Sequence, residues 1–305
     1  MRRAILVVTI IITAVLVGTS AVAYAKQSDP TSSETTSPET TEPITIENHA
    51  WKNYHWARKT NPFTLKLGDN VESAWDSTTA PVFDTTISDW NKSTVLKTTR
   101  VTGGTNPKNC RATSGQVEVC NAKYGSNGWL GIATIWVSGD HITQGTTKLN
   151  DTYFNTAKYN TPAWRNLVMC QEVGHNFGLA HQDEDFYNGN LDTCMDYTIN
   201  PETNQHPNLH DYDQLRAIYD PTFTSTWTPT QTGHLDTTTT VGQTSTSTGS
   251  DNEPGNVPSA WGREVYKSAN GQVSVYEKEL SKGQKKVTHV LWTEEKADQR
   301  REHKE

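Results

Sequence analysis

Apolar residues are scarce in this chain of 305 residues, of which only 33% are hydrophobic. A single globular domain of this length is usually nearer half apolar. Either the chain is largely unfolded, or polar segments dilute an ordinary domain. The apolar residues are spread unevenly along the sequence, which favours the second interpretation. The composition also excludes a polytopic membrane protein, a collagen and a long coiled coil.

Positive charge is in short supply as well. The 27 Lys and Arg residues face 34 Asp and Glu residues, which gives a formal net charge of -7. A nucleic-acid-binding surface needs clustered basic side chains to neutralise phosphates. We therefore expect no nucleic-acid partner and no polybasic attachment to a membrane surface.

Long hydrophobic runs are absent except at the N-terminus. There, Arg2 and Arg3 precede an apolar run, and Ala23 and Ala25 provide the small side chains of a cleavage site. We predict a signal peptide over residues 1–25. The alternative is an uncut signal anchor, because the apolar stretch is nearly long enough to span a bilayer. In both cases the rest of the chain is extracellular, either secreted or tethered to the membrane or wall.

Two polar segments divide the remaining chain. Residues 26–43 are rich in Ser, Thr and Pro, and residues 221–258 are rich in Thr. Such segments cannot bury enough apolar surface to offset chain entropy, so both are predicted to be linkers. Between them lies one domain, 44–220, which is long enough for a real core.

A short β-rich segment, 259–293, follows the second linker. Asn270-Gly271 between two β-rich runs predicts a hairpin, and 287–292 predicts a third strand. Three strands bury little surface, so this segment is either marginal alone or docked on the main domain. Residues 294–305 form a mixed-charge tail without periodicity, which we expect to fray.

Cysteine is also rare, with four residues that all fall in the central domain. An even number in an exported chain indicates disulfides rather than a catalytic thiol. Of the three possible pairings we favour Cys110–Cys120, which closes a short loop, and Cys170–Cys194. The second would close a loop worth about 3 kcal/mol in chain entropy.

The most informative stretch runs from Thr161 to His181. Thr161 is suited to cap a helix whose first residue is Pro162, and Gly178 is suited to end it. On this helix Gln171 and His175 are four residues apart and share a face. A turn at the glycine would direct His181 back to the same place, which is the arrangement of a zinc site.

These residues resemble the metzincin zinc peptidases. The family pattern is His-Glu-x-x-His-x-x-Gly-x-x-His followed by a Met-turn, and this chain has Gln171-Glu172-x-x-His175-x-x-Gly178-x-x-His181 with Met195 and Tyr197 downstream. The organisation is closest to matrixin-like enzymes, whereas the Met-x-Tyr spacing is more like astacins and serralysins.

The resemblance implies a role for each matching residue. Zn²⁺ would be held by Gln171, His175 and His181, and Glu172 would be the general base. Tyr197 would stabilise the transition state, and Met195 would form an apolar floor beneath the ligands. The departure from the pattern is Gln171, whose amide oxygen is a weaker zinc ligand than imidazole. If Gln171 does not bind, the third ligand could be Asp183, His141, His206 or His210.

The fold implied is α+β. It has a twisted, mainly parallel sheet, an active-site helix, a C-terminal helix near 210–219, and the small C-terminal β segment. The strand-like segments are 62–67, 95–101, 116–119 and 132–137. In metzincins a strand above the cleft pairs with the substrate backbone, and 132–137 is the candidate for that strand. The segment 71–92 is helix-like but interrupted at Pro81.

Acidic residues gather downstream of the second histidine of the pattern. A calcium site is one interpretation, and a solvated acidic loop is the favoured one, because no spacing matches a defined calcium loop. The residues concerned are Asp183, Glu184, Asp185, Asp192 and Asp196.

The function expected is that of a secreted, monomeric zinc endopeptidase acting on peptides or proteins. The alternative is a weakly active or inactive metzincin scaffold that serves in binding or adhesion, because Gln171 replaces the first zinc histidine.

Overall fold

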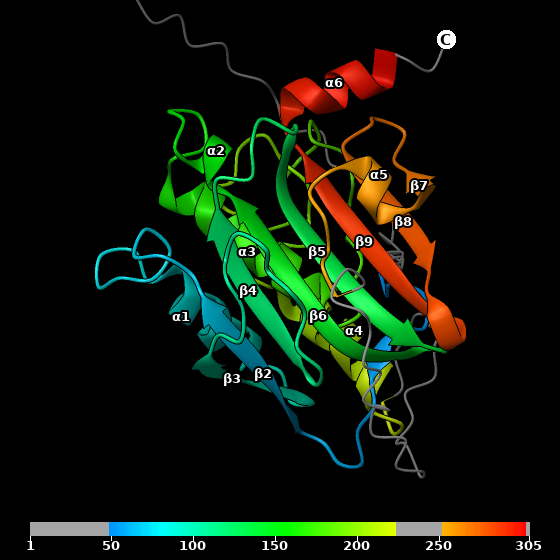
Figure 1. Cartoon of the computed structure of the whole chain (residues 1–305). Helices are drawn as coiled ribbons and strands as arrows, with labels where there is room; N and C mark the ends of the chain where they lie inside the picture. Colours follow the sequence, from blue (N-terminus) through cyan, green and yellow to red (C-terminus); the bar gives the residue numbers. More distant parts are fainter. Residues whose placement is uncertain (1–48, 224–251, 303–305) are drawn as a thin grey trace, which may run out of the picture. The chain divides into compact units, whose positions relative to one another are not determined.

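The computed structural model describes residues 49–223 and 252–302, all within the compact unit Ile44–Glu305 (Figure 1). The predicted signal peptide, the first linker and most of the second linker lie outside the described residues. Within the described ranges, no helix is both long enough and apolar enough to cross a membrane.

A single nine-stranded sheet forms the framework, with strand order β3-β2-β4-β6-β5-β9-β8-β7, and β1 pairs with β6. The strands are β1 His55–Trp56, β2 Phe63–Asn70, β3 Leu96–Thr102, β4 Gln116–Ala122, β5 Trp129–Ser138, β6 His141–Asn150, β7 Arg263–Lys267, β8 Val273–Glu279 and β9 Gln284–Trp292.

The sheet is mixed. Pairing is parallel between β2 and β3, β2 and β4, β4 and β6, and β1 and β6. It is antiparallel from β6 through β5, β9 and β8 to β7. The α+β class is therefore confirmed. The expected mainly parallel character holds only for the half from β3 to β6, because the C-terminal strands add an antiparallel half.

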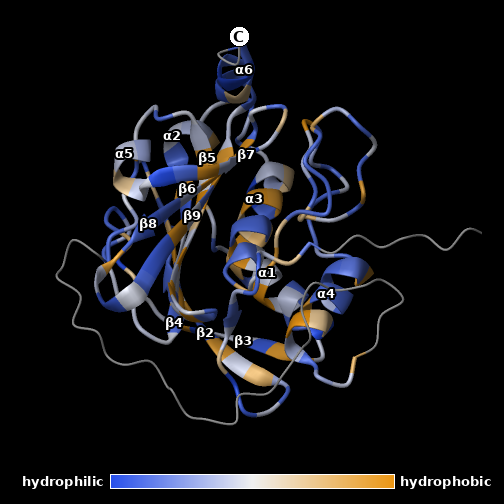
Figure 2. Ribbon diagram, turned by 90° about the vertical axis from the view of Figure 1, so that its right-hand side faces the viewer, coloured by the Kyte–Doolittle hydropathy of each residue, from blue (hydrophilic) through white to orange (hydrophobic). Residues whose placement is uncertain are grey.

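The helices are α1 Val82–Trp90, α2 Asp151–Phe154, α3 Pro162–His175, α4 Leu209–Tyr219, α5 Pro258–Trp261 and α6 Glu294–Glu302. Helices α1 and α3 pack against each other on one side of the sheet, where α3 contacts β5 and β6 (Figure 2). Five tryptophans are buried in the core: Trp75, Trp90, Trp129, Trp136 and Trp164.

Helix α3 begins where the sequence predicts. The Thr161 hydroxyl accepts a hydrogen bond from the Trp164 amide at 3.2 Å, and Pro162 occupies the first turn. Beyond the helix, Gly178 adopts φ +93°, and a Cβ there would collide with the Tyr54 carbonyl oxygen. Only glycine fits both conditions, so the chain can reverse towards His181.

The C-terminal segment is docked on the main domain, which was one of the two expectations. Strand β9 pairs with β5 along nearly its whole length. Residues 252–258, which the sequence assigns to the second linker, are among those described, and the Ala112 amide donates to the Asn252 carbonyl oxygen at 2.9 Å. The expected frayed tail is wrong over α6, whose acidic first turn and basic last turn favour a helix. Its Glu294 and Glu295 also bind Lys158.

Both expected cysteine pairs lie at disulfide distance. The Cα atoms are 6.0 Å apart for Cys110 and Cys120 and 5.9 Å apart for Cys170 and Cys194. The second pair joins α3 to the segment that carries Met195. Two such pairs fit an oxidising, extracellular environment.

Two buried lysines hold the segment 252–261 against the sheet face opposite α3 (Figure 1). Lys148 Nζ donates to Asn256 Oδ1 at 2.7 Å, and Lys286 Nζ donates to the Ala260 carbonyl at 3.2 Å. The pKa of Lys148 is lowered to about 7, chiefly by burial; Glu253 opposes the shift, and nearby Lys286 contributes to it.

This shift predicts a pH-dependent stability. Below pH 7 Lys148 is protonated in both the folded and the unfolded chain, and between pH 7 and 10.5 only the unfolded chain holds the proton. The lysine's contribution to the free energy of unfolding should therefore rise with pH in this window, by at most ~1.4 kcal/mol per pH unit. We expect Lys148→Met to remove this slope between pH 7 and 9 in urea titrations. Lys123→Met, at an exposed site, should retain it, and equal slopes in all three chains would contradict the assignment.

Candidate metal centre

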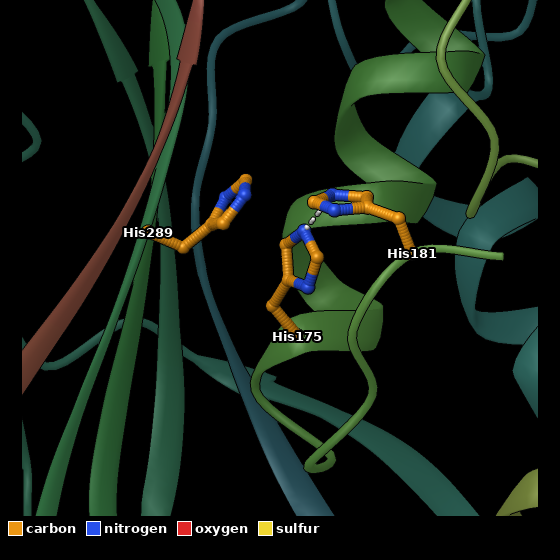
Figure 3. A group of neighbouring side chains, drawn as sticks. All are labelled: His175, His181 and His289. Atoms are coloured by element: carbon orange, nitrogen blue, oxygen red, sulfur yellow. Dashed lines mark hydrogen bonds between the residues drawn. The ribbon is translucent and has the colours of Figure 1, made fainter. Parts of the chain in front are cut away.

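Three histidines from separate parts of the chain converge beside α3 (Figure 3). His175 is the last residue of the helix, His181 follows the Gly178 turn, and His289 projects from β9. One ring nitrogen of each lies within 4.8 Å of the others. All three histidines are largely buried, and none is more than 8% exposed.

The hydrogen bonds of the outer ring nitrogens determine which atoms face the centre. His175 Nδ1 lies 2.8 Å from the Leu179 carbonyl oxygen, and His181 Nδ1 lies 3.3 Å from Glu184 Oε1. Both partners are acceptors, so in each neutral ring Nδ1 carries the proton and Nε2 carries a lone pair. The two Nε2 atoms nevertheless lie only 3.0 Å apart. Lone pairs that face each other so closely fit a site for a shared cation.

The protonation states also suit a metal. Burial lowers the pKa of His289 to about 3, and burial together with the neighbouring imidazoles lowers the pKa of His175 and His181 well below the usual value. The rings are therefore neutral near pH 7, which is the form that binds zinc. Nitrogen ligands of a tetrahedral zinc lie about 3.3 Å apart, between the separations of 3.0 and 4.8 Å found here.

His289 is the member of the cluster that the sequence alone did not reveal. It lies beyond the second linker and reaches the cluster because β9 pairs with β5, which places it opposite Ala133. Its imidazole packs 3.9 Å from that of His175, measured between ring centroids. The only indication in the sequence was that this histidine lies inside an apolar, strand-like run. A histidine in such a run is more often a core residue with its hydrogen bonds made than a metal ligand.

Glu172 lies next to the cluster. Its Oε2 is 3.5 Å from His289 Nδ1, and its side chain is 0% exposed. Neither carboxylate oxygen has a hydrogen-bond partner among the described residues. Burial raises the pKa of Glu172 to about 8, against a smaller opposing effect of His175. A buried carboxylate without a partner is costly, and such groups concentrate at functional sites.

Gln171 lies one turn before His175, and its side chain is buried. Its Nε2 donates to the Cys194 carbonyl at 2.8 Å, and its Oε1 has no hydrogen-bond partner among the described residues. The hollow beside it and Tyr197 has a volume of only about 10 Å³, which is about the space of one water. Its role as a metal ligand stays a prediction.

The other candidate ligands have partners elsewhere. Asp183 Oδ1 accepts from the Asp185 amide at 2.7 Å and from Asn188. His206 pairs with Asp89, whereas His141 packs against His55 and His210 against His49. Within the described residues none of these four belongs to the histidine cluster.

Tyr197 lies beside the histidine cluster, and Met195 lies against the end of α3. The Tyr197 hydroxyl is 3.4 Å from His289 Nε2, and its ring packs 4.4 Å from that of His181. Met195 is fully buried, and its Sδ would lie 2.7 Å from a Cβ at Gly174. The sulfur thus packs closely against the end of α3, beneath the ligands.

The acidic loop contains no group that the structure brings together as a cation site within the described residues. Asp196 is buried; burial raises its pKa to about 6, and its Oδ2 accepts from the Leu191 amide and from Asn204. The calcium interpretation therefore stays a prediction.

The strand expected to pair with substrate is already paired on both sides. Residues 132–137 belong to β5, which pairs with β6 along one edge and with β9 along the other. The expectation of substrate addition at this strand is therefore wrong for the described structure. The physical reason is that the C-terminal segment itself provides the added strand.

Sequence comparisons add no relative. No model of a known protein family matches the chain, and no curated protein matches it significantly.

Proposed function

We propose that this protein is a zinc-dependent endopeptidase whose metal is held by His175, His181 and His289. The observation that carries the proposal is the meeting of three neutral, buried imidazoles beside a fully buried carboxylate. Three protein ligands with an open fourth position are typical of catalytic zinc sites. When bound, zinc supplies a Lewis acid that polarises a carbonyl and lowers the pKa of water.

The chain's own residues supply the rest of the chemistry. In its ionised form Glu172 accepts the proton of the attacking water and later transfers it to the leaving amine. The Tyr197 hydroxyl, held between His289 and the ring of His181, is placed to donate a hydrogen bond to the developing oxyanion. The Leu179 carbonyl and Glu184 orient the two histidines of the pattern.

The choice of a peptidase rests on the resemblance to metzincins. The Glu172-x-x-His175 spacing, the Gly178 turn, His181 and the Met195-x-Tyr197 segment all match that pattern. The imidazole missing at Gln171 is replaced by one from β9, which removes the main objection to zinc binding.

Zinc stoichiometry and peptide hydrolysis test the proposal together. The full-length exported chain should contain one zinc per molecule and cleave unfolded casein, and a chelator should abolish the cleavage until zinc is restored. Absence of bound zinc after purification in zinc-containing buffer would contradict the proposal.

A non-catalytic binding module is the second candidate. It is favoured by the complete burial of Glu172 and by the covering of the β5 edge. Stoichiometric zinc with no turnover of casein or of a peptide library would favour it over the peptidase.

A substitution at Gly131 tests the proposed role of Glu172 as the general base. A Cβ at this position of β5 would lie 2.7 Å from both Cγ and Oε1 of Glu172. Gly131→Ala should therefore displace the carboxylate and lower turnover by about 10- to 100-fold, with zinc content unchanged. Gly189→Ala, where a Cβ meets nothing within 4 Å, is the matched control. Equal turnover in both variants would remove Glu172 from the mechanism.

A further inference from the structure

An apolar pocket of about 330 Å³ opens onto the histidine cluster, and both His181 and His289 line it. It lies between the main domain, which contributes Trp51 and Ala180, and the C-terminal hairpin, which contributes Val273 and Val275. None of the three histidines lines the 10 Å³ hollow beside Gln171. A group from solvent can therefore approach the cluster through this pocket.

The wall of the pocket is continuous with the cluster. Val275 is the cross-strand neighbour of His289 on β8 and β9. The indole of Trp51 lies edge-on at 5.8 Å from the His175 ring and 6.2 Å from the His289 ring, measured between centroids. An occupant of this space would contact apolar walls and two of the three proposed ligands at once.

The charged groups at the rim are paired with each other. Lys52 forms an ion pair with Glu277, and the Tyr266 hydroxyl donates to Glu184. Lys52 is balanced by Glu277, and apart from Lys52, Glu184 and the two histidines the lining is aliphatic or aromatic. The volume is at the lower end for ligand pockets, which suits one large side chain rather than an extended chain.

We propose that this pocket is the specificity pocket of the enzyme and takes an aromatic or branched aliphatic side chain of a peptide substrate. The inference rests on the proposed zinc peptidase function. The substrate then enters side chain first, between the main domain and the C-terminal hairpin, instead of pairing with β5. The C-terminal segment thus supplies both a metal ligand and half of the substrate pocket.

Two hydroxamates that differ only in their apolar group test this pocket. Binding of acetohydroxamate and 3-phenylpropanohydroxamate to the zinc-loaded, full-length chain is measured by calorimetry. Burial of the phenyl group should make the second compound bind about 10- to 100-fold more tightly. Equal affinities would overturn the pocket assignment while leaving the zinc site intact. A chain that holds no zinc and binds neither compound would overturn the proposed function as well.

A pair of variants tests whether the difference in affinity between the two hydroxamates arises in this pocket. Val265→Phe, on the edge strand β7, fills the pocket, and the affinity ratio should fall to within about threefold of one. Val101→Phe is the matched control, because Val101 is equally half-buried but lies on the opposite edge strand, β3. The control should keep the full ratio. An unchanged ratio in Val265→Phe would overturn the assignment, and the two-compound comparison on the unaltered chain stands even if this variant fails to fold.

Discussion

Replacing His289 with alanine should lower zinc affinity by at least about 100-fold, because two imidazoles alone hold zinc poorly. The loss should appear as zinc content near zero after dialysis and as a weaker dissociation constant in chelator competition. The melting temperature should also stop rising with added zinc, since a ligand stabilises the folded protein only to the extent that it binds to it.

Two further variants make this result specific. His141→Ala removes a histidine from β6 that lies outside the cluster, and it should retain one zinc per chain. Gln171→Met removes the amide that the family pattern places in the first ligand position, while preserving the length of the side chain. Retained zinc in Gln171→Met and lost zinc in His289→Ala is the expected outcome. The reverse outcome would restore Gln171 as the third ligand and remove His289 from the site.

Replacing Glu172 with glutamine should abolish turnover without changing zinc content. The amide has nearly the same shape but cannot accept the proton of the attacking water, and loss of a general base costs about 10²–10⁴-fold. The variant should be at least as stable as the parent chain, because the buried carboxylate has no hydrogen-bond partner among the described residues and its burial is unfavourable.

Casein cleavage, zinc content and urea denaturation measured on the same preparations separate these effects. Glu202→Gln, at an exposed position, is the control and should match the parent chain in all three. Full activity in Glu172→Gln would contradict the catalytic role of Glu172 even if the zinc site is correct.

The local sequence was sufficient to predict those parts of the fold that depend on residues close together in the chain. Thr161 and Pro162 predict where α3 begins, and Gly178 predicts the turn that returns His181 to the helix. Asn270-Gly271 likewise predicts the hairpin between β7 and β8, whose strands have the expected antiparallel register. Each of these features is set by backbone conformation within a few residues.

Features that depend on long-range pairing were not predictable. His289 enters the cluster only because β9 occupies the edge of β5, and no pattern in the sequence encodes which strand pairs with which. Strand β6 was missed for a related reason. Its Thr-rich and Lys-containing sequence looks exposed, yet Thr146, Thr147 and Lys148 are all buried by neighbours from distant segments.

The central claim is that one zinc ion is shared by the active-site helix, the turn that follows it and the C-terminal strand. Anomalous diffraction at the zinc absorption edge, from crystals of the zinc-loaded full-length chain, tests it most directly. The account predicts one strong peak bonded at about 2.0–2.1 Å to a ring nitrogen of each of His175, His181 and His289. A peak bonded to Gln171 with His289 turned away, or no peak among these histidines, would contradict it.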